Sequence, residues 1–230
     1  MAESEPDQVT LAERARKYQL VFKRLQENYG TPQWRQHLEP VDELVSTILS
    51  QSTSDINRDK GFYALKAHYA DWESVMNAPE QEIIETIRPA GLANQKGPRI
   101  QAALQYIREQ RGVIELNFLN DMSIEEAKAW LARIKGVGPK TAAIVLLFAF
   151  DRPAFPVDTH VHRLARRIGL INPGTSANKA HEMIEDIAAP ETYYPMHLNL
   201  IRHGREICKA RNPKCRQCIL QELCDSFPIE

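Results

Sequence analysis

The sequence predicts an all-α protein, and three observations carry that prediction. Only 10 of its 230 residues are glycine, strand-like alternation is scarce, and apolar residues recur at helical spacing along most of the chain. Hydrophobic residues make up 43% and charged residues 26%, a globular composition that can bury a substantial core. About ten short helices with short connections account for this pattern.

The expected helices follow one another with breakers between them, among them Pro40, Pro79, Gly91 and Pro153. Ser123-Ile124-Glu125-Glu126 has the spacing of a capping box, so one helix should open there. In chain order the expected helices cover residues 11–27, 41–50, 60–68, 72–76, 81–87, 96–108, 123–134, 139–150, 159–168, 177–187 and 194–207.

Composition also limits the location and the partners. The longest apolar run, residues 142–150, is too short to cross a bilayer, and the acidic start resembles no leader or transit peptide. We therefore expect a soluble intracellular protein. The net charge is −1, which taken alone argues against a nucleic-acid partner. The charge is uneven, however: residues 1–130 hold 15 basic and 20 acidic residues, and residues 131–230 hold 14 and 10. A polyanion-binding face should therefore use mainly the later part of the chain.

A glycine-rich turn, Ile134-Lys135-Gly136-Val137-Gly138-Pro139-Lys140-Thr141-Ala142, separates two of the expected helices. Its glycines permit a tight turn, and the proline suits the first position of the next helix. Backbone amides of Gly136, Val137 and Gly138 at that helix start would seat one phosphate of a duplex. A helix corner without a ligand is the alternative.

Two further residues are candidates for catalysis: Lys140, within this motif, and Asp158, after it. Lys140 takes the second position of the new helix, where the positive end of the helix dipole suits an amine nucleophile, although contact with phosphate is the commoner use of such a lysine. Asp158 stands directly before a basic helix and is its natural N-cap, a role that needs no catalysis.

The four cysteines lie within 17 residues, spaced C-x6-C-x2-C-x5-C. Four thiolates can bind one zinc ion or a cubane iron–sulfur cluster. Only one pair is C-x2-C, and the uneven arms favour the cluster, with zinc or disulfides as alternatives. The expected ligands are Cys208, Cys215, Cys218 and Cys224. Lys209 and Arg211 lie between the first two, as phosphate contacts or as part of a solvated loop.

These three motifs together resemble the endonuclease III family of helix–hairpin–helix DNA glycosylases, in the family's order, from about Leu44 to Cys224. The resemblance implies a bilobal all-α fold. Residues 33–152 would form a six-helix barrel domain with the hairpin, and residues 1–32 plus 153–230 a discontinuous domain with a [4Fe-4S] cluster.

The same resemblance implies a bifunctional DNA glycosylase/AP lyase of base excision repair. Such an enzyme removes oxidised pyrimidines and cleaves the abasic site by β-elimination, with Lys140 as the nucleophile and Asp158 stabilising positive charge on the sugar. It would be a cytoplasmic, nucleoid-associated monomer that binds double-stranded DNA carrying a damaged base or an abasic site. The alternatives are a related glycosylase for mismatched thymine or modified cytosine, and a non-catalytic DNA-binding iron–sulfur protein.

The chain departs from the family pattern at two places. Lys135 and Pro139 stand where the family hairpin often has Pro and Arg. The family's L-S-x-Q-x-x-D, whose Gln fills the gap left by the flipped base, reads L-S-Q-S-T-S-D here, so Gln51 is one residue early and Ser52 takes its place. Both are therefore candidates for this wedge, and Leu92 matches the family's second wedge.

Overall fold

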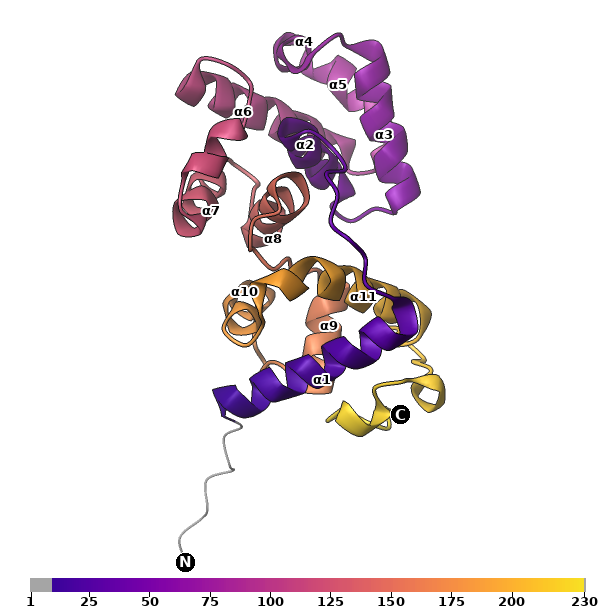
Figure 1. Cartoon of the computed structure of the whole chain (residues 1–230). Coiled ribbons are helices and arrows are strands. Elements are labelled where there is room, and N and C mark those ends of the chain that lie inside the picture. Colours follow the sequence, from indigo (N-terminus) through magenta and orange to yellow (C-terminus); the bar gives the residue numbers. More distant parts are fainter. Residues whose placement is uncertain (1–9, 230) are drawn as a thin grey trace, which may run out of the picture. The chain divides into compact units, whose positions relative to one another are not determined.

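The computed structural model describes residues 10–229, which form two compact units (Figure 1). One unit is Arg35–Arg152, and the other joins the chain up to Trp34 with the chain from Pro153 onward. The sequence predicts that the first of these domains covers residues 33–152. The described residues contain helices and no strand, which confirms the all-α class. None of these helices has the length and apolarity needed to cross a membrane.

The unit Arg35–Arg152 packs around α2, which is buried along almost its whole length and contacts α3, α6 and α8. Its helices are α2 Pro40–Ser50, α3 Asp55–His68, α4 Trp72–Asn77, α5 Glu80–Thr86, α6 Ala93–Arg111, α7 Ile124–Ala132 and α8 Pro139–Ile144.

The largest differences from the sequence-based expectation in this unit concern α8 and α3, whereas α6 extends three residues beyond the expected range at each end. The expected helix over residues 139–150 is α-helical only to Ile144 and continues as a π-helical segment, Val145–Ala149. An unbroken apolar run shows no period, so it could not reveal this change. Helix α3 begins five residues earlier than expected, at Asp55, because the Ser54 side chain accepts a hydrogen bond from the Asn57 amide and caps it.

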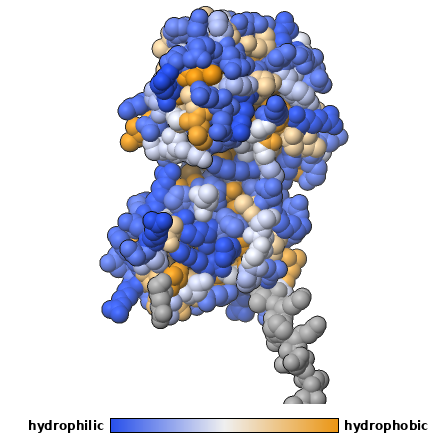
Figure 2. Space-filling model, turned by 180° about the vertical axis from the view of Figure 1, so that it is seen from behind, coloured by the Kyte–Doolittle hydropathy of each residue, from blue (hydrophilic) through white to orange (hydrophobic). Residues whose placement is uncertain are grey.

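The second unit is built on α11, which packs against α1 and α9. Its helices are α1 Leu11–Tyr29, α9 Thr159–Ile168, α10 Ala177–Glu185 and α11 Tyr193–Glu206, followed by a loop with two 3-10 turns that carries the cysteines. Figure 1 shows this loop in yellow beside α1. Hydrophilic residues predominate on the face shown in Figure 2, and the hydrophobic ones form small separate groups.

Candidate functional site

The glycine-rich turn is a hairpin between α7 and α8. A capping box of Ser123 and Glu126 opens α7, as expected, and Pro139 occupies the start of α8. Gly136 has φ +88°, a conformation that favours glycine. Gly138 has φ −98°, which any residue can adopt, and nothing in the protein lies within 4 Å of an added Cβ, so the fold does not require glycine here.

The three hairpin residues predicted to contact phosphate are not equivalent. The amide of Val137 donates to the Ile134 carbonyl at 3.0 Å, and its side chain is buried. The amides of Gly136 and Gly138 make no hydrogen bond to any residue among those described, and both residues are exposed. Val137 therefore anchors the turn, and Gly136 and Gly138 are the residues whose amides remain available to an anion.

Substitution of the two glycines by alanine should affect the stability of the protein differently. Gly136→Ala should destabilise the protein by about 1–2 kcal/mol, because alanine is strained at positive φ and its Cβ would lie 3.1 Å from Cδ of Arg99. Gly138→Ala is the matched control: nothing lies within 4 Å of its added Cβ, so thermal stability should be unchanged. Thermal denaturation of both variants measures this, and equal losses of stability would contradict the account.

Positive charge gathers both near the hairpin and at the cysteines. Residues 131–152 hold four basic residues and one acidic residue, and residues 208–224 also hold four basic residues and one acidic residue. The exposed Lys135 also lines a pocket beside α6, together with Gln95, Pro98, Arg99 and Ala102.

Two of the three wedge candidates, Ser52 and Leu92, have a positive φ angle. Their φ values are +53° and +49°, in the left-handed region that such residues rarely adopt. Both are exposed, Leu92 by 50%. Gln51 instead is half-buried, and its Oε1 accepts a hydrogen bond of 3.0 Å from Nη1 of Arg99. Non-glycine residues in this conformation concentrate at functional sites, so the geometry favours Ser52 over Gln51 as the exposed residue of its turn.

The two catalytic candidates lie in different units. Lys140 is the second residue of α8 and is half-buried. Asp158 is the N-cap of α9, and its Oδ1 accepts the Val161 amide at 2.7 Å. Its other carboxylate oxygen has no hydrogen bond to the residues that the structure describes. Capping thus uses one oxygen and leaves the second for another role.

Two buried histidines fix the segment that leads to Asp158, a role that sequence reasoning missed. Nδ1 of His181 donates to the Phe155 carbonyl at 2.8 Å, and Nδ1 of His197 donates to the Pro156 carbonyl at 3.0 Å. Both histidines come from helices distant in the sequence, so no local pattern could have revealed these bonds. They hold the backbone immediately before the aspartate from two sides.

The four cysteines line one pocket, with Ile207, Pro213, Gln221, Phe227 and Ile229 completing its wall. About 270 Å³ of the space between them contains no protein atom, part of it open to solvent. All four are free thiols, which contradicts the disulfide alternative. Four thiols that line one space fit a cubane cluster.

Hydrogen-bond donors surround the cysteine sulfurs. Nη1 of Arg167 lies 3.3 Å from Sγ of Cys208, and Nε2 of His203 lies 3.3 Å from Sγ of Cys218. Burial lowers the pKa of His203 to about 4, so it is neutral at pH 7, and burial raises the pKa of the Cys218 thiol to about 11. The neighbouring N–H groups would compensate the negative charge of a cluster-bound Cys218 thiolate.

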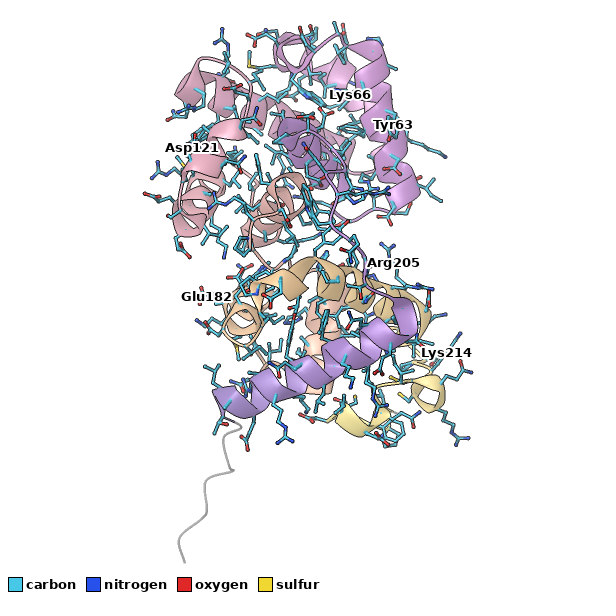
Figure 3. All side chains as sticks on the ribbon, in the orientation of Figure 1. Tyr63, Lys66, Asp121, Glu182, Arg205 and Lys214 are labelled. Carbon is cyan, nitrogen blue, oxygen red and sulfur yellow. The ribbon has the colours of Figure 1, made fainter. Side chains whose placement is uncertain are left out.

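Two arginines of α9 hold the cysteine loop in place, so they are engaged within the protein and differ from the exposed cations of the loop itself. Arg163 donates to the carbonyls of Gly204 and Cys208, and Arg167 donates to the carbonyls of Lys209 and Ala210. These two guanidinium groups are thus engaged within the protein. The exposed cations of the loop are Lys209, Arg211, Lys214 and Arg216. Figure 3 shows Lys214 on the loop, with its side chain directed away from the ribbon.

Comparison with known proteins agrees with this geometry. Residues 45–190 match the family described as HhH-GPD superfamily base excision DNA repair protein. Residues 208–224, from the first cysteine to the last, match the iron–sulfur binding domain of endonuclease III. This match confirms the predicted [4Fe-4S] cofactor.

Individual relatives agree as well. Endonuclease III of Thermotoga maritima is 32% identical over 85% of this chain and 87% of its own. A putative DNA glycosylase of Arabidopsis thaliana is 36% identical over 73% of this chain, which spans only 57% of that longer protein. The solved structure of a non-covalent endonuclease III–DNA complex superposes with a TM-score of 0.78 at 27% identity, covering 92% of this chain and 95% of that one.

Proposed function

Because the chain belongs to the endonuclease III family of the HhH-GPD base excision repair superfamily, we propose that it is a bifunctional DNA glycosylase and abasic-site lyase acting on oxidised pyrimidines. The observation that carries this proposal is Lys140, placed at the start of the helix that follows the hairpin. An amine is the one group of this motif that can attack C1′ and remain bound to the sugar as an imine.

The proposed reaction begins when the damaged nucleotide leaves the base stack, since C1′ is inaccessible inside a duplex. The Lys140 amine attacks C1′, the glycosidic bond breaks, and the base leaves and takes up a proton. The sugar ring opens to a Schiff base on Lys140. Loss of a C2′ proton then breaks the C3′–O bond and cuts the strand on its 3′ side, with the phosphate as leaving group.

Asp158 would act on the charge that this reaction creates. Its carboxylate would stabilise the positive charge on the sugar as the base leaves, and would accept the proton that the attacking amine loses. The backbone before it, held by His181 and His197, cannot follow the substrate freely, so the carboxylate is preorganised.

The hairpin and the cysteine loop are proposed to bind the DNA backbone. Amides of Gly136 and Gly138 would bind one phosphate, and the exposed Lys209 and Arg211 others. The Cys ligands, once bound to the cluster, crosslink the loop that presents these cations, and no chemical step passes through the cluster.

Salt dependence tests the contribution of the loop. Lys209→Gln should weaken binding to an abasic duplex and reduce the slope of log affinity against log salt by about 1, because one phosphate contact is lost. Lys179→Gln, an exposed lysine paired with Glu182 on α10, is the control and should leave the slope unchanged. Equal slopes for Lys209→Gln and the unmodified protein would contradict this contact.

A panel of duplexes, each with one lesion, tests the function as a whole. Duplexes with thymine glycol should be cut without added alkali, because the lyase step breaks the strand. A glycosylase without lyase activity would leave abasic sites that break only after alkali. Products that appear only after alkali, or no excision of any oxidised pyrimidine, would contradict the proposal.

A second candidate is a glycosylase of the same superfamily with another base preference, such as mismatched thymine or modified cytosine. Ser52 at the wedge position favours it, because serine cannot fill the space of a base as glutamine does. The same lesion panel separates the two candidates by which duplex is processed fastest.

A further inference from the structure

Lys96 is the most unusual buried residue of the unit Arg35–Arg152. Its side chain is 1% exposed, and no ion pair among the described residues includes it. A buried ammonium without a carboxylate is rare, because removing the charge from water is costly. Hydrogen bonds must therefore compensate the hydration that the ammonium group loses on burial.

Backbone carbonyls provide these hydrogen bonds. Nζ of Lys96 donates to the Leu49 carbonyl and to the Ala90 carbonyl, each at 2.7 Å. Leu49 lies in the last turn of α2, where carbonyls lack helical partners. Ala90 ends the 3-10 turn Arg88–Ala90 that precedes α6. One ammonium thus joins the ends of two helical segments that are about forty residues apart in sequence.

These two ends lead directly into the two wedge candidates. Ser52 follows Leu49 by three residues, and Leu92 follows Ala90 by two. The amide of Lys96 also donates to the Leu92 carbonyl at 3.0 Å, so its backbone and side chain hold the same turn. Helix α3 also packs closely against this turn, because a Cβ added to Gly61 would lie 2.9 Å from Cβ of Ala90.

A neighbour on the same helix face extends the connection. Arg99, three residues after Lys96, bonds Gln51 and lies against Gly136 of the hairpin. Helix α6 therefore contacts the Ser52 turn, the Leu92 turn and the hairpin through two side chains and one backbone amide.

We propose that Lys96 is a positioning residue that holds the turns of Ser52 and Leu92 at a fixed separation, so that both enter the base stack together. This rests on the proposed function, because it takes these turns as the wedges. Lys96 does not touch the reacting sugar; it determines how well the duplex is opened. The base must leave the stack before Lys140 can react, so a loose pair of wedges slows extrusion and leaves the later chemistry intact.

Two variants test this inference. Lys96→Met keeps an unbranched side chain up to Cε and leaves both carbonyls without their donor. Leu104→Ala instead destabilises the same helix through a buried apolar residue that no wedge contact involves. Thermal denaturation ranks their stabilities. Excision of a damaged base in a duplex should fall about tenfold or more in Lys96→Met at temperatures where the protein is folded, and should change little in Leu104→Ala.

A preformed abasic site separates opening from chemistry, because no base has to be extruded. Borohydride trapping on such a site should fall less than about threefold in Lys96→Met. A readout without chemistry completes the test: 2-aminopurine opposite an abasic analogue, bound by proteins that also carry Lys140→Gln. Its fluorescence increase on binding should be smaller when Lys96→Met is added.

The outcomes are distinct. Equal losses of excision in Lys96→Met and Leu104→Ala, or an unchanged fluorescence increase, would overturn the role of Lys96. Failure of the unmodified protein to excise any base or trap any abasic site would overturn the proposed function instead.

Discussion

Lys140→Gln should abolish cleavage of an abasic duplex and the borohydride-trapped adduct, a loss of about a thousandfold or more. Glutamine keeps a polar side chain of similar length but has no amine that can form an imine. Duplex affinity should change only modestly, since a single cation is lost among several.

Lys135→Gln is the matched control for this experiment. It lies five residues earlier on the same hairpin, is exposed, and removes the same unit of charge. Its cleavage rate should stay within a few-fold of the unmodified protein at low salt. If both variants lost cleavage equally, Lys140 would be a phosphate contact, the commoner use of a lysine at a helix start.

The second large effect concerns the cysteines. Cys218→Ser should remove the cluster, so that visible absorption is lost and iron falls from about four per chain toward zero. Stability should fall by about 3 kcal/mol or more, a decrease in Tm of about 10 °C, because the loop loses its crosslink.

Arg216→Ala is the control in the same loop. Its side chain is exposed and only its carbonyl accepts a hydrogen bond, from Gln221, so iron content and Tm should be unchanged. A Cys218→Ser protein with full iron content and unchanged Tm would show that Cys218 is not a ligand.

Local signals predicted the parts of the site that depend on neighbouring residues. A capping box at Ser123, a proline at the start of α8 and a cap at Asp158 each depend on residues within four positions, and all three are present. The cysteine spacing likewise indicated the cluster, which the family match confirms.

Contacts between distant segments could not be predicted in this way. A lysine in the sequence G-L-A-N-Q-K reads as a surface residue, because its acceptors at Leu49 and Ala90 meet it only in the folded unit. Arg163 and Arg167 add to the basic charge of the later part of the chain, yet they donate to carbonyls of the cysteine loop. The charge pattern alone cannot tell a free cation from one engaged within the protein.

The left-handed conformation of Ser52 and Leu92 was also beyond the sequence, since neither residue favours it. The side chains differ as well: that of Gln51 is bound by Arg99, whereas Ser52 is exposed, which favours Ser52 as the proposed wedge. Because the glutamine of the motif is shifted by one residue, position 51 carries a hydrogen-bonded side chain and position 52 an exposed one.

The most direct test of the proposed chemistry is to identify the residue that forms the covalent bond. The unmodified protein is reduced with borohydride on an abasic duplex, digested, and the peptide that carries the sugar remnant is sequenced by mass spectrometry. We expect a single modified residue, Lys140. A remnant on Lys135, on the N-terminal amine or on any other residue, or no covalent peptide at all, would contradict it.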